Sequence, residues 1–376
     1  MSKLPNIETS IFAVMTTLAQ KHNAVNLSQG FPNFNPPERL IELINHYMKK
    51  GKNQYAPMTG TAELRYALAE KYKKFYKAEY DIDEEITITA GGTQALFTAI
   101  TAFVEAGDEV IVFEPAYDSY IPSIILNGGI PIPIQMDENF KIDWNKVKSK
   151  ITSKTKMIII NSPHNPSGSI LEKSDLESLK EIICNQNIIL LSDEVYEHII
   201  FDENKYYSLI GDSALLEKTI AVYSFGKTYH ATGWKMGYVL AKKKLMREFR
   251  KVHQFNVFSV NTPVQLALAD FLTDEDHFLS LGNFYQQKRD YFLNLINGSR
   301  FKHKPSLGTY FQLLDYSEIS DKNDYDFSMQ LIEQNKIAVI PLSPFYSTKN
   351  NYKKIRICFA KTNDILEQAA EILMKI

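Results

Sequence analysis

Short apolar runs alternate with helical patterns from about residue 86 onward. Several runs are rich in isoleucine and valine without polar alternation, which is typical of strands covered on both faces. Between Ala95 and Val104 the apolar residues recur at helical spacing, and we expect Gly107 to end that helix. Strand followed by helix, repeated, predicts an α/β fold with a mainly parallel sheet flanked by helices. The predicted strands are residues 86–89, 109–114, 130–135, 157–161, 188–192, 219–224 and 237–241.

The two ends of the chain have a different pattern from the middle. A helix at about 11–22 precedes a short strand and a loop. After residue 280 the pattern predicts a long helix at about 283–297, an Ile/Val strand at 337–340 and a final helix. We therefore predict two domains, with a long helix around 241–275 bridging them. The large domain is predicted at 37–280, and a smaller α+β domain at 1–36 and 281–376.

Composition limits the classes of function. The 376 residues include 42 Lys+Arg and 44 Asp+Glu, and a net charge of −2 argues against nucleic acid as the main partner. Two cysteines, Cys184 and Cys358, are too few for a disulfide framework or a four-ligand zinc site. The histidines lack ligand spacing, so no metal is expected. So few cysteines favour a reduced, cytoplasmic protein. No apolar run approaches 18 residues and the N-terminus is polar, so we expect no membrane span and no signal peptide.

Polar residues follow several predicted strands at the point where each strand ends. Asp193 follows the strand at 188–192, and Lys227 follows the strand at 219–224. In open parallel sheets ligands bind beyond the carboxyl ends of the strands, so we expect these side chains to share one site. Each residue alone has an ordinary interpretation as a turn, a helix cap or a surface charge, and only their convergence indicates function. The residues at this edge are Gly91, Gly92, Thr93, Asn165, Asp193, Tyr196, Ser224 and Lys227.

Ordered motifs resemble a known family. Residues 224–237 read SFGKTYHATGWKMG, which resembles the cofactor-lysine signature of fold-type I, class I pyridoxal-phosphate aminotransferases. Residues 161–168 (NSPHNPSG) and 193–196 (DEVY) follow in the family's order and approximate spacing, and 355–359 (IRICF) resembles its carboxylate-arginine strand. The resemblance runs from Asn26 to the end of the chain. Within the family it is closest to the methionine aminotransferase and kynurenine/glutamine transaminase branch.

The resemblance implies pyridoxal 5'-phosphate as the cofactor and assigns residues to its ring. Lys227 is implied to attach to the cofactor aldehyde and, once released, to move the substrate's α-proton. Asp193 is implied to face the ring nitrogen, where an opposite charge favours the protonated form. Tyr196 and Asn165 are implied to hydrogen-bond the ring oxygen, and Tyr117 to stack on the ring face.

The resemblance also implies a phosphate cup. Backbone N–H groups and the helix dipole at a glycine turn suit a phosphate dianion. Lys235 stands where many class I enzymes have arginine, an exchange that is usual in the kynurenine/glutamine branch. Tyr55 resembles a tyrosine that reaches the phosphate from the other subunit, which implies a homodimer with shared active sites. The cup is predicted to comprise Gly92, Thr93, Gln94, Ser224, Lys235 and Tyr55.

Substrate contacts are implied in the same way. Arg356 is expected to hold the α-carboxylate in a two-bond fork, and Gly30 to allow close approach of the backbone. Phe12, Phe31 and Phe258 are the predicted side-chain pocket, with Phe258 coming from the partner subunit. None of the seven arginines lies in residues 253–259 of that pocket. An aromatic pocket without a cation favours methionine, glutamine or aromatic side chains over a second carboxylate.

The leading hypothesis is a ping-pong aminotransferase that moves the amino group of methionine, and also of aromatic amino acids or glutamine, to a 2-oxo acid. Kynurenine transamination and a cysteine-conjugate or cystathionine-type β-lyase activity stay open, because the same lysine serves all three. An aminotransferase-like effector domain is disfavoured, since we expect no DNA-binding module before Asn26. A nucleotide-binding protein built on Gly91 and Gly92 is disfavoured because no P-loop lysine follows.

Overall fold

The computed structural model describes residues 2–5, 7–184, 186–348 and 350–376. Its centre is a seven-stranded sheet with the strand order β2-β8-β7-β6-β5-β3-β4. All neighbours pair in parallel except β8, which runs antiparallel to both β2 and β7. The prediction of a mainly parallel α/β sheet is thereby confirmed. The strands are β2 (Ile86–Thr89), β3 (Glu109–Glu114), β4 (Ile130–Gln135), β5 (Thr155–Asn161), β6 (Ile189–Asp193), β7 (Thr219–Ser224) and β8 (Gly237–Ala241).

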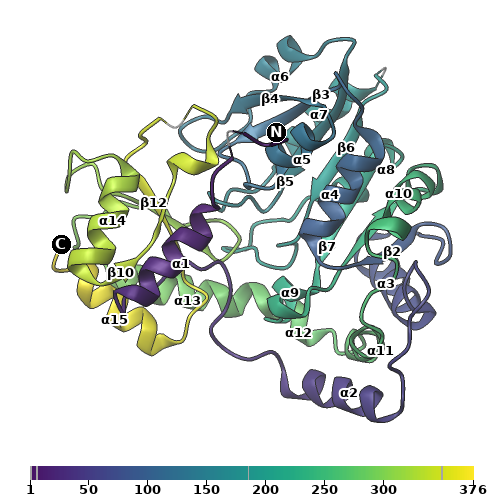
Figure 1. Cartoon of the computed structure of the whole chain (residues 1–376), viewed down its shortest axis with the longest axis horizontal. Coiled ribbons are helices and arrows are strands. Elements are labelled where there is room, and N and C mark those ends of the chain that lie inside the picture. Colours follow the sequence, from purple (N-terminus) through teal and green to yellow (C-terminus); the bar gives the residue numbers. More distant parts are fainter. Residues whose placement is uncertain (1, 6, 185, 349) are drawn as a thin grey trace.

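Apolar residues cover this sheet on both faces. Along β3, Val110 and Val112 pack into a cluster with α4, α5 and α10. The alternate residues Ile111 and Phe113 pack into a second cluster with α6 and α7. This two-sided burial explains why the strands show no polar alternation. Figure 1 shows these helices flanking the sheet, and their bounds are α4 (Gly92–Phe103), α5 (Tyr120–Leu126), α6 (Trp144–Lys150), α7 (Lys173–Ile183) and α10 (Lys243–Asn256).

The C-terminal part forms smaller sheets with a different connectivity. An antiparallel sheet has the order β11-β12-β9, and a two-stranded parallel sheet joins β1 to β10. The N-terminal helix α1 (Ile11–Lys21) packs on β10 and β11, so the first residues lie beside the C-terminal part as expected (Figure 1). The strands are β1 (Val25–Asn26), β9 (Phe311–Asp315), β10 (Ile337–Ala338), β11 (Ile340–Pro341) and β12 (Lys354–Cys358).

The remaining helices complete the two parts. Helix α13 is the long helix expected near residue 283, and α15 is the expected final helix. Every helix of the described residues is too short or too polar to span a membrane. The remaining α-helices are α2 (Glu38–Lys49), α3 (Ala62–Tyr76), α8 (Ser213–Leu216), α9 (Phe225–Thr228), α11 (Thr262–Phe271), α12 (Asp276–Leu279), α13 (Leu281–Leu295), α14 (Asp324–Asn335) and α15 (Asn363–Leu373), with 3₁₀ turns η1 (Leu209–Gly211), η2 (Thr232–Trp234) and η3 (Ser343–Phe345).

The prediction of one bridging helix at 241–275 is wrong. The chain forms α10 and α11 instead, because Phe258 adopts a left-handed conformation (φ 65°) and Asn261 caps α11 by accepting from Val264 N–H. Pro263 falls in the first turn of α11, where a missing N–H costs nothing. Neither helix bridges the two parts, since α10 packs on α4 and α11 packs on α2 and α3.

The predicted strand at 337–340 is also divided. Ile337 and Ala338 pair with β1, whereas Ile340 and Pro341 pair with β12. The chain therefore passes from one small sheet to another at Val339, which apolar patterning does not reveal.

We propose to keep the domain limits at 36/37 and 280/281, which leave the seven-stranded sheet in one unit and the smaller sheets in the other.

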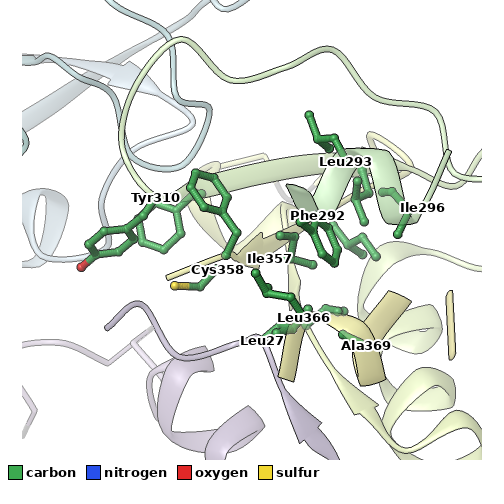
Figure 2. Packing of buried hydrophobic residues seen from close by; sticks show 14 of the residues in the cluster. Leu27, Phe292, Leu293, Ile296, Tyr310, Ile357, Cys358, Leu366 and Ala369 are labelled. Atoms are coloured by element: carbon green, nitrogen blue, oxygen red, sulfur yellow. The ribbon is translucent and has the colours of Figure 1, made fainter. Parts of the chain in front are cut away.

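The core of the C-terminal part reaches the edge of the large sheet. Its apolar cluster joins β9, β12, α13 and α15, and includes Phe292, Ile357 and Leu366 (Figure 2). Tyr310 lies at one end of the drawn residues, beside Cys358. Tyr196, from the chain after β6, belongs to the same cluster. Residues from both parts therefore meet beyond the carboxyl ends of β5, β6 and β7.

Candidate active site

A cavity of about 200 Å³ lies at the carboxyl ends of β5, β6 and β7. This is the position expected for ligands in an open parallel sheet. It brings together an amine, a carboxylate, phenols, an amide and a glycine turn from separate elements. The lining residues are Gly91, Gly92, Thr93, Leu96, Tyr117, Asn161, Asn165, Asp193, Val195, Tyr196, Ser224, Gly226, Lys227, Thr232, Lys235 and Met236.

The glycine turn between β2 and α4 forms one wall of the cavity. Gly91 is the N-cap of α4 and has φ 81°, a conformation that L side chains rarely adopt. A Cβ on Gly92 would lie 2.9 Å from Val195 Cγ1, so any side chain there would force movement. Lys235 lies close to this turn, with its Nζ 3.6 Å from where a Cβ of Gly91 would be. Free N–H groups at a helix start, beside an ammonium, favour an anion.

Asp193 ends β6 and is buried. Tyr120 OH donates to its Oδ2 at 2.6 Å, and Val195 N–H donates to Oδ1 at 3.4 Å. Burial raises the pKa of Asp193 to about 6, although both hydrogen bonds and Lys227 act in the opposite direction. A buried carboxylate of this kind is stabilised by a cationic ligand group placed against it.

Lys227 lies in α9, directly after β7. Its Nζ donates to Tyr310 Oη at 2.8 Å and lies 3.4 Å from the carbonyl oxygen of Gly30. Burial lowers the pKa of Lys227 to about 8, with the charges of Lys235 and Arg356 acting in the same direction. A large fraction of this amine is therefore neutral near pH 8, which is the form that attacks a carbonyl carbon.

Arg356 on β12 is buried and is held by neutral groups. Its Cζ lies 3.9 Å from the ring centroid of Phe311 and 5.0 Å from that of Phe12. Its Nη1 donates to Asn165 Oδ1 at 2.8 Å, and Nη2 lies 3.5 Å from Ser28 O. Among the residues that the structure describes, Nε has no hydrogen-bond partner and none of the hydrogen bonds goes to a carboxylate. A buried guanidinium without an anion is a strong carboxylate-binding group.

Most of the predicted site residues meet in or beside this cavity. Gly30 lies beside the cavity because its carbonyl oxygen contacts Lys227. Arg356 lies beside it because it contacts Asn165, and Phe12 in turn contacts Arg356. Gln94 turns its side chain away: its Oε1 accepts from Ala90 N–H and its Nε2 donates to Thr98. Ten predicted residues line the cavity directly, namely Gly91, Gly92, Thr93, Tyr117, Asn165, Asp193, Tyr196, Ser224, Lys227 and Lys235.

Three predicted residues lie outside the cavity within one chain. Tyr55 is 82% exposed and Phe258 is 55% exposed, and the centroids of their rings lie 5.4 Å apart. Phe31 is 39% exposed, with Lys361 Nζ 5.2 Å from its ring centroid. A single chain therefore does not assemble Phe12, Phe31 and Phe258 into one pocket. Tyr55 and Phe258 were expected to act from a partner subunit, and that expectation stays a prediction.

The sequence did not single out two phenols that contact the central residues. Tyr120 donates to Asp193, and Tyr310 accepts from Lys227. Tyr120 lies three residues after Tyr117, so the motif around Tyr117 offered a signal for it. Tyr310 precedes an apolar strand and has the pattern of a core residue, so only the tertiary structure reveals it. No group of three His, Cys, Asp or Glu in the described part of the chain is placed to hold a metal ion.

This fold and site define a known class of enzymes. The family model for class I and II aminotransferases matches residues 22–373, and the chain belongs to that family. It is 48% identical over 377 residues to the methionine aminotransferase of Escherichia coli (strain K12), covering 100% of this chain and 98% of that protein. It is 32% identical to human kynurenine–oxoglutarate transaminase 1, with 99% and 97% coverage.

Solved structures agree with the sequence relatives. An E. coli protein whose crystal structure and reactivity identify a methionine aminotransferase function superposes with a TM-score of 0.98 at 47% identity, covering 100% of this chain and 99% of that chain. The N-succinyldiaminopimelate aminotransferase of Mycobacterium tuberculosis superposes with a TM-score of 0.94 at 33% identity, covering 100% and 99%. The protein is therefore an aminotransferase with the fold of the pyridoxal-phosphate-dependent enzymes.

Proposed function

We propose that this protein is a pyridoxal 5'-phosphate-dependent aminotransferase that takes methionine as an amino donor and a 2-oxo acid as acceptor. The observation that carries the proposal is that Lys227 and Asp193 line one cavity and that Arg356 lies beside it, bonded to the lining residue Asn165. The likeness to the E. coli methionine aminotransferase, at 48% identity over the whole chain, supports methionine as the donor.

The residues present fit the cofactor. The Gly91–Gly92 turn, with no room for side chains at Gly92, suits close approach of a phosphate to backbone N–H groups. Asp193, whose charged form is disfavoured by burial, suits a protonated ring nitrogen. Lys227, with a pKa lowered to about 8, suits bonding to an aldehyde. Among the residues that the structure describes, Asp193 is the one carboxylate in the lining of the cavity, so no other acidic side chain there repels a phosphate.

Each part of the cavity would hold one part of the cofactor. Thr93, Ser224 and Lys235, with the N–H groups at Gly92 and Gln94, would bind the phosphate. Asp193 would face the ring nitrogen, and Tyr196 and Asn165 would hydrogen-bond the ring oxygen. Tyr117, held by a 3.1 Å contact between its OH and Thr93 Oγ1, would cover the ring face.

Bound pyridoxal phosphate supplies an electron sink for negative charge at the substrate's α-carbon. The chain's own contribution to proton movement is Lys227. Its neutral amine would take the proton from the substrate's α-carbon and deliver it to the cofactor carbon that carried the aldehyde. One nitrogen would thus act first as base and then as acid. Burial serves this task, because it brings the amine pKa close to neutral pH.

Arg356 and Asn165 would orient the amino acid. The guanidinium offers Nε and Nη groups to the α-carboxylate, and Asn165 Oδ1 fixes the plane of the fork through Nη1. Phe12 and Phe345 lie against the same guanidinium and present an apolar wall. An apolar wall favours the thioether of methionine over a second carboxylate.

We also propose a cytoplasmic homodimer with shared active sites. The exposure of Tyr55 and Phe258 supports a partner subunit that covers them. The free cysteines Cys184 and Cys358 fit a reducing compartment. A partner would bring Tyr55 to the phosphate and Phe258 to the substrate side chain.

The test is to incubate the cofactor-loaded protein with methionine and a panel of 2-oxo acids and to measure 4-methylthio-2-oxobutanoate by chromatography. We expect formation of this product that depends on the oxo acid. Lys227→Ala should abolish it, and Arg356→Lys should raise KM for all amino acids about tenfold or more. Product formation by Lys227→Ala, or an unchanged KM in Arg356→Lys, would contradict the residue assignments.

Two other reactions are separated in the same assay. Kynurenine is offered in place of methionine, and release of pyruvate and ammonia from a cysteine conjugate is followed without any oxo acid. We expect a higher kcat/KM for methionine than for kynurenine, and little lyase product. A dominant lyase reaction would reject transamination as the main activity.

A further inference from the structure

Tyr310 is a buried phenol that neither the motifs nor the assigned roles use. It directly precedes β9 and is fully buried, as are Cys358 and Ile357 in the same cluster (Figure 2). Its hydroxyl lies 2.8 Å from the Nζ of Lys227, which lines the cavity, and 2.8 Å from the carbonyl oxygen of Gly30. A phenol thus contacts the amine on which the proposed reaction depends.

The direction of these hydrogen bonds follows from chemistry. A carbonyl oxygen only accepts, so the Tyr310 proton points at Gly30 O. The phenol oxygen then has only lone pairs to offer to Lys227, and the amine must donate one N–H to it. Gly30 O, 3.4 Å from Lys227 Nζ, is a second acceptor for the amine.

This arrangement fixes the orientation of the neutral amine. Two N–H groups of Lys227 face Tyr310 Oη and Gly30 O, so its lone pair points away from both. The lone pair is the part of the amine that bonds to a carbonyl carbon or takes a proton. A freely rotating amine would present this lone pair only part of the time, so a fixed orientation raises reactivity.

The surroundings hold both acceptors in place. The Tyr310 ring packs against Tyr196 at 5.2 Å and against Phe311 at 4.9 Å. The Gly30 segment is held by Lys361, whose Nζ donates to Phe31 O at 2.8 Å. A Cβ on Gly30 would lie 2.9 Å from Phe311 Cζ, so only glycine allows its carbonyl this position without displacement.

We propose that Tyr310, together with the Gly30 carbonyl, is a positioning residue that aims the lone pair of the Lys227 amine into the cavity. The proposal deepens the aminotransferase function and rests on it. It adds a determinant of the proton-transfer step that is distinct from cofactor and carboxylate binding.

The test compares Tyr310→Phe with wild type and with Tyr285→Phe as a matched control. Tyr285 belongs to the same cluster, 5.6 Å from the Tyr310 ring, but its OH bonds to His230. We expect kcat of Tyr310→Phe with methionine to fall roughly tenfold to a hundredfold, while KM changes less than twofold. The kinetic isotope effect of α-deuterated methionine should rise, because proton transfer becomes slower relative to other steps. Tyr285→Phe should match wild type in all three values.

A second readout does not depend on turnover. Apoprotein is mixed with pyridoxal phosphate, and covalent capture is followed by absorbance at pH values well above 8. We expect slower capture by Tyr310→Phe. Affinity for pyridoxine 5'-phosphate, which has an alcohol and cannot bond to the lysine, should be unchanged. The pH is kept high so that the Lys227 amine is neutral in every variant, because neighbouring groups also influence its pKa. These neighbours are Asp193, Tyr196, Lys235, Arg356 and Cys358.

The outcomes are distinct. Wild-type values of kcat, isotope effect and capture rate in Tyr310→Phe would overturn the proposal. A parallel loss of pyridoxine phosphate affinity would also overturn it, because that loss indicates a general change of the pocket. Failure of the aminotransferase function itself would be seen in the wild-type protein, as no transamination and no capture of pyridoxal phosphate.

Discussion

At the scale of single residues, burial works against charge at three residues of the site. It raises the pKa of Asp193 to about 6 and lowers that of Lys227 to about 8 and that of Arg356 to about 10. In each case the neutral form gains over the charged form. The site is therefore built for ligands that bring the opposite charge, at a cost to the stability of the ligand-free protein.

The raised pKa of Asp193 predicts a stabilising substitution. A carboxyl whose pKa is higher in the folded state is best tolerated below pH 4, and stability falls as pH rises from about 4 to about 6. Asp193→Asn removes this penalty, so the apoprotein should gain on the order of 2 kcal/mol at pH 8. Urea denaturation at pH 5 and pH 8 measures it, and the gain should be smaller at pH 5.

The exposed Asp321→Asn is the control and should change stability little at either pH. A less stable Asp193→Asn apoprotein at pH 8 would contradict the interpretation. With the cofactor bound, the order should reverse, because the carboxylate then pairs with a cationic ring.

Lys227 should titrate well below an ordinary lysine. Competitive acylation of the apoprotein by acetic anhydride, with mass spectrometry of the peptides, reports the fraction of each lysine that is neutral. The reactivity of Lys227 should rise with a midpoint near pH 8. The exposed Lys52 provides the internal reference, and a midpoint for Lys227 above 10 would exclude the proposed burial effect.

The sequence revealed the residues that stand in motifs and missed those defined only by packing. Asp193 and Lys227 follow predicted strands, and a parallel sheet must bring such positions together. Tyr310 follows a left-handed Thr309 and precedes β9, where an aromatic residue ordinarily indicates a core. Its contact with Lys227 depends on how the two parts of the chain meet, which local patterns do not encode.

At the scale of elements, the segment after β6 is held in place by two buried carboxylates, Glu194 and Glu197, which follow the functional Asp193. Glu194 accepts from Tyr223 OH at 2.9 Å and Ser208 Oγ at 2.5 Å. Glu197 accepts from Lys71 Nζ at 2.7 Å and Tyr76 OH at 2.8 Å. Glu194 and Glu197 lie between and after the cavity residues of this segment, and they hold its backbone against α3, β7 and Ser208.

Removing one partner of the buried Lys71–Glu197 pair should be strongly destabilising. Both side chains are nearly inaccessible, at 6% and 4% exposure, so Glu197→Leu leaves an ammonium buried without its anion. We expect a loss of about 3–5 kcal/mol in the free energy of unfolding. The double variant Lys71→Met/Glu197→Leu should lose less than the sum of the two single variants. Denaturant titration of the four proteins measures this, and simple additivity would contradict the pairing.

The predicted elements were right where one apolar pattern began and ended with the element. The seven central strands follow this rule. The errors arose where an apolar pattern continued across a break, at Phe258 between α10 and α11 and at Val339 between β10 and β11. Both breaks depend on backbone conformation and pairing partners, and an apolar residue at each position hides them.

At the scale of the whole molecule, the cavity lies where the large sheet meets the C-terminal part. Asp193 and Lys227 come from the former, and Arg356 and Tyr310 from the latter. Sequence patterns predicted both parts but not their contact. The exposed rings of Tyr55 and Phe258 have no role within one chain, which favours their contact with a second copy of the chain.

Subunit complementation tests the shared site. Lys227→Ala lacks the amine, and Tyr55→Ala lacks the predicted phosphate contact. In a hybrid dimer, one site combines the intact Lys227 of one subunit with the intact Tyr55 of the other, so mixing the two weak variants should restore activity. The hybrid is isolated with two different affinity tags. Absence of any rescue, although hybrids form, would place Tyr55 outside the partner's site.

The guanidinium of Arg356 is surrounded by aromatic rings, and within the described part of the chain its hydrogen bonds go only to neutral oxygens, which has a practical consequence for handling the enzyme. Any small monocarboxylic acid in the solution is a competitor for it, whether or not it has an amino group. Acetate or formate buffers should therefore slow the reaction and raise the melting temperature of the apoenzyme at the same time. Activities are best compared in amine or sulfonate buffers.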